Sequence, residues 1–152
     1  MITTEEIFIK KYINSNFIQT GIFLESIIKD NLTIKCLEYQ SKINLDEQKE
    51  SYWRKEAFKV FGYDWYNFNY MLPKAYSNSS KKDVIMKHSR NTKIFGLRGL
   101  VSLKSNYDNI TFSEYKKYKK EMNAAVHNKF VFYGVLCAPR FICKFIIKLA
   151  SK

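Results

Sequence analysis

TFSEYKKYKKEMNAAV, residues 111–126, carries the clearest secondary-structure signal in the chain. Thr111 and Glu114 form a T-x-x-E capping box, in which side chains satisfy the free backbone N–H groups at a helix start. Tyrosine and apolar side chains follow on one helical face: Tyr115, Tyr118, Met122, Ala125 and Val126. The other face carries four lysines: Lys116, Lys117, Lys119 and Lys120. This spacing predicts one amphipathic helix that buries its tyrosine face.

A second T-x-x-E box, Thr3 and Glu6, predicts a helix that continues to about Asp30. One face of this helix carries residues spaced by three or four positions: Ile13, Phe17, Gly21, Leu24 and Ile28. The alternating residues 32–39 then indicate either a short strand or a buried extended connection.

Further helices are predicted in the middle of the chain. Asn44 and Glu47 resemble a helix start, and Gly62 is a natural stop. Either Ser79 or Ser80 caps a short helix through Lys87. Residues 93–104 fit a helix or a strand, and the helical step of their apolar positions favours the helix. The sequence therefore predicts a mainly α protein, a small helical domain of five or six helices with little or no sheet.

Positive charge is concentrated in the second half of the chain. The 152 residues carry a formal charge of +12, yet residues 1–62 hold nine basic and nine acidic side chains. Residues 63–152 hold seventeen basic and five acidic ones and so account for the whole excess. This asymmetry indicates an anionic partner, such as phosphate, nucleic acid or lipid headgroups.

The cysteines and the N-terminus bear on the cellular compartment. Cys36, Cys137 and Cys143 are odd in number and form no C-x-x-C pair, which predicts a reducing compartment and no disulfide framework. The first ten residues do not resemble a secretory signal. We therefore expect a cytoplasmic protein, which could also bind peripherally to the inner face of the membrane. Neither histidine stands at metal-ligand spacing, so we expect no metal and no cofactor.

Residues 129–152, KFVFYGVLCAPRFICKFIIKLASK, form the most apolar segment. The uncharged run 130–138 is less than half of the about 20 residues needed to span a bilayer. Beyond Pro139, one helical face carries Phe141, Ile142, Phe145, Ile146 and Leu149, and another carries Arg140, Lys144 and Lys148. This pattern is typical of a helix that lies in the membrane interface, and equally of a terminal helix docked on its own core. We divide the chain into a helical domain, 1–128, and an amphipathic basic tail, 129–152, in which Lys129 adds to the expected membrane or anion contacts.

Two other features suggest binding surfaces. The lysines at 116, 117, 119 and 120, with interleaved tyrosines, could contact nucleic-acid phosphates, or form a solvated face opposite a tyrosine core. The aromatic residues within 63–76 could stack on bases or sugars, form a protein interface, or pack in the core. His88, two residues before Arg90, is interpreted as a loop histidine that is either solvated or in contact with a phosphate.

Asp46, Glu47, Arg54, Gly62 and Tyr63 stand in an order that resembles a segment of bacterial family-2 (GT-A) glycosyltransferases. The resemblance covers residues 46–152 and the C-terminal part of such enzymes, in which a basic, aromatic region and a membrane-seeking tail follow the segment. It implies that Asp46, Glu47 and Arg54 are candidate catalytic residues, because the acidic pair of that family includes the catalytic base. Residues 1–45 show no counterpart of the nucleotide-binding half or its D-x-D motif.

These observations together favour a membrane-peripheral helical protein linked to cell-surface glycan synthesis, as a glycosyltransferase-like remnant or partner. Its partners would be an anionic membrane surface or another envelope-synthesis protein. A basic nucleic-acid-binding module and a helical protein–protein interaction domain are the alternatives.

Overall fold

The computed structural model describes residues 4–33 and 52–150, and within these ranges all regular structure is helical. The predicted mainly α class is confirmed. The expected five or six helices are wrong, because several predicted helices are broken into shorter ones. The observed elements are α1 (Thr4–Tyr12), α2 (Ile18–Lys29), α3 (Tyr52–Lys55), the π-helix η1 (Phe58–Asp64), α4 (Trp65–Met71), α5 (Asn78–Thr92), α6 (Leu97–Asn106), α7 (Phe112–Lys117), α8 (Lys119–Ala125), α9 (Lys129–Cys137) and α10 (Arg140–Ala150).

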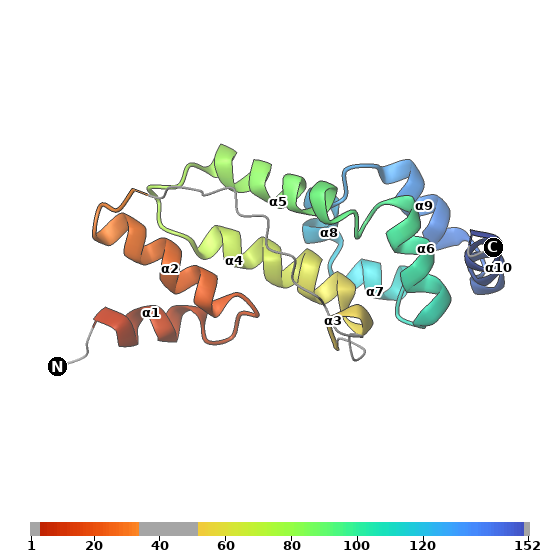
Figure 1. Ribbon diagram of the computed structural model, residues 1–152, viewed down its shortest axis with the longest axis horizontal. Coiled ribbons are helices and arrows are strands. Elements are labelled where there is room, and N and C mark those ends of the chain that lie inside the picture. Colours follow the sequence, from red (N-terminus) through yellow and green to blue (C-terminus); the bar gives the residue numbers. More distant parts are fainter. Residues whose placement is uncertain (1–3, 34–51, 151–152) are drawn as a thin grey trace.

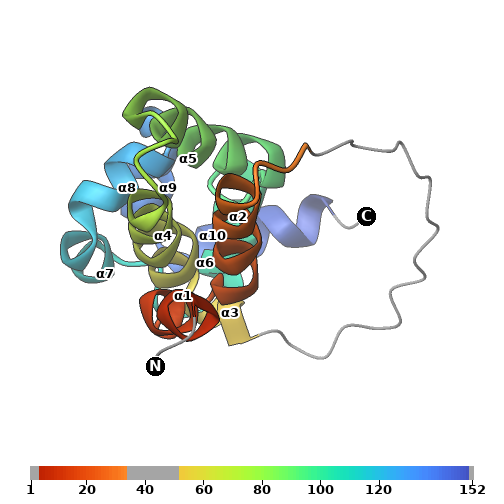
Figure 2. The same ribbon diagram turned by 90° about the vertical axis from the view of Figure 1, so that its left-hand side faces the viewer.

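The described helices form an elongated bundle (Figure 1). The α1–α2 hairpin lies at one end of the long axis and α10 at the other. Between them, α5 lies alongside α4, and α8 packs on both η1 and α5. Figure 2 looks along the bundle from the hairpin end and shows the C-terminal end of α10 projecting beyond the other helices. The predicted strand or extended connection at 32–39 lies outside the described residues except for Leu32 and Thr33, which are in no regular element.

The predicted helix from Thr3 to Asp30 is wrong, because the chain turns between Tyr12 and Ile18. Tyr12 is fully buried, and its ring packs on the backbone of Gly21 in α2. A Cβ at position 21 would lie 2.6 Å from Cγ of Tyr12, so the absence of a side chain allows the hairpin to close. Ile13 is 60% exposed rather than on the buried face.

The predicted helix stop at Gly62 is also wrong, since Gly62 lies inside η1, which continues directly into α4. Gly62 is buried where α8 crosses, and Sδ of Met122 occupies the space that a Cβ would need. The glycine is therefore explained by a close helix crossing rather than by a helix end. The helix start at Asn44 and Glu47 lies outside the described residues.

The helix predicted for residues 111–126 begins as expected, since Oγ1 of Thr111 accepts a hydrogen bond from the backbone N–H of Glu114 at 3.2 Å. It is broken at Tyr118, whose φ of −120° and ψ of 29° separate α7 from α8. The expected inner face is buried at Tyr115, Met122, Ala125 and Val126. Tyr118 is only half-buried and packs on Tyr63 instead, with ring centroids 5.4 Å apart.

The helix predicted through Lys87 begins earlier and ends later than expected. Oγ of Ser77 accepts from the backbone N–H of Ser80, so Ser77 is the N-cap, and α5 continues to Thr92. Residues 97–104 are helical in α6, as favoured from the sequence. Lys93, between the two helices, has a left-handed backbone with φ of 54°.

Two clusters of buried side chains hold the bundle together. The smaller one joins Tyr12 of α1 to Phe68 and to Leu72 at the end of α4. The larger one draws on elements from α5 to α10 and on η1, and includes Phe58, Phe95, Leu100, Met122, Phe132 and Cys143. The first half of the predicted tail, α9, thus contributes Phe132, Val135 and Leu136 to the same core as the preceding helices.

Candidate functional site

The predicted membrane-facing segment is a bent pair of helices, α9 and α10, whose axes differ in direction by 112°. Oδ1 of Asn128 caps α9 by accepting from the backbone N–H of Val131 at 3.1 Å. Lys104 of α6 closes the other end of α9, since its Nζ donates to the carbonyl oxygens of Val135 at 2.9 Å and Leu136 at 2.7 Å. A lysine at this position satisfies the last carbonyls of a helix and its negative end.

Helix α10 is attached to α6 through its inner side. Cys143 is 1% exposed and Ile147 packs against the main core. Arg140 donates from Nε to the carbonyl oxygen of Ser105 at 3.2 Å and forms an ion pair with Asp108. These contacts determine which side of α10 is turned away from the protein.

The outward side of α10 is apolar. Phe141 is 69% exposed, Phe145 60% and Leu149 57%. Two further side chains, Ile142 and Ile146, extend the same face and are also exposed. At 100° per residue, Phe145 lies about 180° from the direction midway between Cys143 and Ile147. The apolar face thus points directly away from the core rather than into it.

A basic sector lies beside this outward face. Lys144 and Lys148 are exposed, and Arg140 begins the same side of the helix. The helix therefore has three sectors: a narrow inner one, a basic flank and a broad apolar outer face. At the start of α9, Lys129 is exposed and Phe130 is 94% exposed.

The predicted basic stripe is divided between two helices. Lys116 and Lys117 lie on α7, and Lys119 and Lys120 on α8; all four are exposed. Lys117 pairs with Glu114, and Nζ of Lys120 lies 5.5 Å from the ring centroid of Tyr66. Of the tyrosines between these lysines, Tyr115 is buried, at 5% exposed, and Tyr118 is half-buried against Tyr63. The stripe offers ammonium groups to an anion.

The glycosyltransferase-like residues are only partly within the described ranges. Asp46 and Glu47 lie outside them. Arg54 is exposed on α3, and its guanidinium carbon lies 5.4 Å from the ring centroid of Trp53. Gly62 and Tyr63 lie in η1, where Gly62 has the packing role described above.

His88 does not lie in a loop, as the sequence suggested, but in α5, where it is half-buried against two aromatic rings. Its ring centroid lies 4.5 Å from that of Trp65 and 5.8 Å from that of Phe61, with the Phe61 ring nearly parallel. Burial holds the pKa of His88 below its usual value of 6.5, because the charged imidazolium is poorly solvated there. His127 is exposed.

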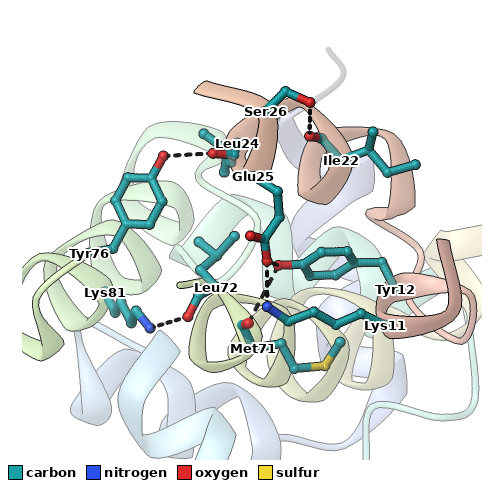
Figure 3. Close-up of polar contacts among 10 residues, drawn as sticks. All are labelled: Lys11, Tyr12, Ile22, Leu24, Glu25, Ser26, Met71, Leu72, Tyr76 and Lys81. Carbon is teal, nitrogen blue, oxygen red and sulfur yellow. Dashed lines mark hydrogen bonds and ion pairs between the residues drawn. The ribbon is translucent and has the colours of Figure 1, made fainter. Parts of the chain in front are cut away.

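A buried polar cluster was not expected from the sequence (Figure 3). Glu25 of α2 is 8% exposed, pairs with Lys11 and accepts from the Tyr12 hydroxyl at 2.8 Å. The single signal was a carboxylate within the mostly apolar stretch 21–28. Burial, and then the hydrogen bond to Glu25, raise the pKa of Tyr12 far above its usual range, so that its hydroxyl remains a donor.

Two further hydrogen bonds join neighbouring segments here, one from Lys81 of α5 to the end of α4 and one from Tyr76, before α5, to α2 (Figure 3). Nζ of the buried Lys81 donates to the carbonyl oxygen of Leu72 at 2.6 Å, and the Tyr76 hydroxyl donates to that of Leu24 at 3.2 Å. Burial lowers the pKa of Lys81. Because the charged groups are engaged by neighbours from adjacent elements, we interpret the cluster as the structural joint between the hairpin and the bundle.

Among the residues that the structure describes, no three histidine, cysteine, aspartate or glutamate side chains gather in a group that could hold a metal ion. Within those same ranges, no single helix has both the length and the apolar character needed to span a membrane. Helices α9 and α10 have the required length and apolar character only when they are taken together, as a bent pair. Comparison with protein-family models, curated proteins and solved structures gives no match.

Proposed function

We propose that this protein docks on an anionic membrane surface through the outward face of α10. One observation carries the proposal: Phe141, Phe145 and Leu149 are each more than half exposed on a helix whose opposite side is attached to the core. Exposing this much contiguous apolar surface to water is unfavourable, and such patches mark interaction sites. The site is a helix face, held in place by α6.

The basic residues around the outward face of α10 support a lipid surface as its binding partner. Lys144 and Lys148 flank the apolar face, and residues 63–152 carry the whole +12 excess. An interfacial helix buries its apolar side chains about 5–10 Å deep while basic heads stay at the phosphate level. Each lysine or arginine near an anionic surface adds roughly 1 kcal/mol of attraction.

The narrower form of the proposal concerns the biological setting. A protein at the inner face of the membrane, as a partner or remnant of a glycosyltransferase, would serve cell-surface glycan synthesis. This part is supported by the resemblance of residues 46–152 to the C-terminal part of family-2 glycosyltransferases, including the position of the tail. A pull-down from membranes with the intact chain would test it: co-purification of an envelope-synthesis enzyme supports the link, and its absence from repeated pull-downs removes it.

Vesicle flotation tests the docking itself. We expect the intact chain to float with vesicles containing phosphatidylglycerol and to remain behind with pure phosphatidylcholine. Phe145→Glu should abolish flotation, because it places a charge at the centre of the inserted face. Phe112→Glu, at a phenylalanine on α7 that is 42% exposed, is the matched control and should float like the parent.

The outcomes separate the alternatives. Failure of the parent to float with anionic vesicles overturns the proposal. If the parent instead binds DNA or RNA with an affinity that falls steeply with salt, the nucleic-acid module replaces it. Concentration-dependent self-association that Phe145→Glu abolishes, in the absence of flotation, would make the α10 face a protein interface.

A further inference from the structure

A cavity of about 500 Å³ lies between α3 and η1 on one side and α6 with its preceding turn on the other. Its apolar wall is formed by Trp53, Phe61, Ile94 and Leu103. Trp53 and Phe61 meet edge to face, with ring centroids 5.1 Å apart at 89°, which holds both rings in place. The volume falls within the range of small-molecule sites, about 300–1,000 Å³.

Three cationic side chains line the same cavity: Arg54, Lys93 and Arg98. No aspartate or glutamate is among the described residues that line it. The guanidinium of Arg54 lies over Trp53, 5.4 Å from the ring centroid, so the cation borders the apolar wall. Cationic side chains with no acidic side chain among the described lining residues, next to a hydrophobic wall, suit a ligand that is anionic at one end and apolar at the other.

The start of α6 also lines the cavity. Arg98 and Gly99 lie in the first turn of α6, a helix of ten residues whose N-cap, Gly96, offers no side-chain acceptor. The free N–H groups and the positive end of such a helix favour an anion. A Cβ at Gly99 would lie 2.5 Å from the carbonyl oxygens of Lys93 and Ile94, so this turn is packed tightly on α6.

Lys93 occupies a left-handed backbone position, with φ of 54°, where glycine is the usual residue after a helix. A lysine in this conformation is disfavoured relative to glycine, and such strain tends to cluster at functional sites. Its position between α5 and α6 places a cationic side chain among the residues that line the cavity.

We propose that this cavity binds a small amphiphilic anion, a phosphate or carboxylate group attached to an aromatic or aliphatic body. The anionic group is bound by Arg54, Lys93 and Arg98, and the apolar body lies against Trp53, Phe61 and Leu103. The site shares no lining residue with the outward face of α10.

Calorimetric titrations of the intact chain with simple probes test the site. Phenyl phosphate carries both an anionic group and an apolar body, whereas inorganic phosphate carries only the anionic group and phenol only the apolar body. We expect phenyl phosphate to bind at least about tenfold more tightly than either, since it gains both the charged contacts and apolar burial. Octyl phosphate, below its micellar concentration, distinguishes an aliphatic from an aromatic body: tighter binding of phenyl phosphate indicates a nucleotide-like ligand, and tighter binding of octyl phosphate a lipid-like one.

Substitutions locate the binding. Arg98→Gln should weaken phenyl phosphate about tenfold, because a charge-assisted contact is lost. Arg90→Gln is the matched control, since Arg90 is exposed on α5 and does not line the cavity, and should bind like the parent. Amide chemical-shift changes should fall within residues 53–61 and 92–107. Equal affinity for phenyl phosphate and inorganic phosphate, unchanged binding by Arg98→Gln, or shifts confined to α10 would each overturn the proposal.

Discussion

The ammonium group of Lys104 on α6 donates a hydrogen bond to the carbonyl oxygen of Leu136, near the end of α9, at 2.7 Å. It donates to the neighbouring Val135 carbonyl as well, and the chain then turns through Ala138 and Pro139 into α10. One side chain therefore satisfies the end of α9 and attaches it to α6, which also carries α10. The direction of the outward apolar face depends on this contact and on the attachment of Arg140 to Ser105.

Lys104→Met should destabilise the protein by about 1–3 kcal/mol, because two carbonyl groups lose a charged donor in a partly buried place. Lys82→Met, on the exposed surface of α5, is the control and should change the free energy of unfolding by no more than about 0.5 kcal/mol. Urea denaturation of both variants measures the difference. Equal stabilities would show that Lys104 does not hold the end of α9.

Gly62→Ala should destabilise by about 1–3 kcal/mol, because the new methyl group meets Sδ of Met122 at the η1–α8 crossing. Combining it with Met122→Ala should lower the free energy of unfolding by less than the sum of the two single losses, since the shortened side chain at 122 leaves room for the new methyl group at 62. Gly134→Ala is the matched control: a Cβ there meets nothing within 4 Å, so it should stabilise by roughly 0.5–1 kcal/mol. If the stability losses of the two single variants simply add up in the double variant, the close contact between positions 62 and 122 is contradicted.

Glu25→Leu should destabilise by about 1–3 kcal/mol, because it removes the nearer of two acceptors of the buried Tyr12 hydroxyl and the partner of Lys11. Glu56 also pairs with a lysine, Lys59, but its side chain is 50% exposed. Glu56→Leu should therefore change stability by less than about 1 kcal/mol. Thermal or urea unfolding of the two variants makes the comparison. A similar loss of stability in both would contradict the proposed role of Glu25 in joining the hairpin to the bundle.

His88 should titrate below pH 6.5, because burial against Trp65 and Phe61 disfavours its charged form. The unfolded chain then binds a proton that the folded chain does not, so stability falls as pH decreases from about 6.5 through the folded-state pKa. His88→Phe should remove this part of the pH dependence, whereas His127→Asn, at an exposed site, should retain it. The imidazole proton resonances give the pKa of His88 directly, and a value at or above 6.5 would contradict its burial.

The helical class could be predicted because local signals and tertiary structure agree in most segments. The Thr111 cap and the buried face of Tyr115 and Met122 follow from capping chemistry and helical spacing. The breaks could not be predicted, because they depend on contacts between distant residues. Gly62 has the sequence signature of a helix end, and only the crossing helix with Met122 explains why it lies inside one.

The amphipathic pattern of α10 was visible in the sequence, but its orientation was not. Spacing places Phe141, Phe145 and Leu149 on one side, and the same pattern fits burial or exposure. Attachment through Cys143, with Arg140 bound to Ser105, turns that side outward. The cavity beside Trp53 and the Glu25 cluster also depend on residues from separate helices, so spacing along the chain gave no indication of them.

The depth of residue 145 in a lipid surface tests the central claim most directly. The emission of Phe145→Trp should shift to the blue when phosphatidylglycerol vesicles are added, beyond any shift of the parent chain, and should be quenched by brominated acyl chains. Phe112→Trp on α7 is the control and should show neither effect. A tryptophan at 145 that stays unshifted and unquenched in the presence of these vesicles would contradict docking through the outward face of α10.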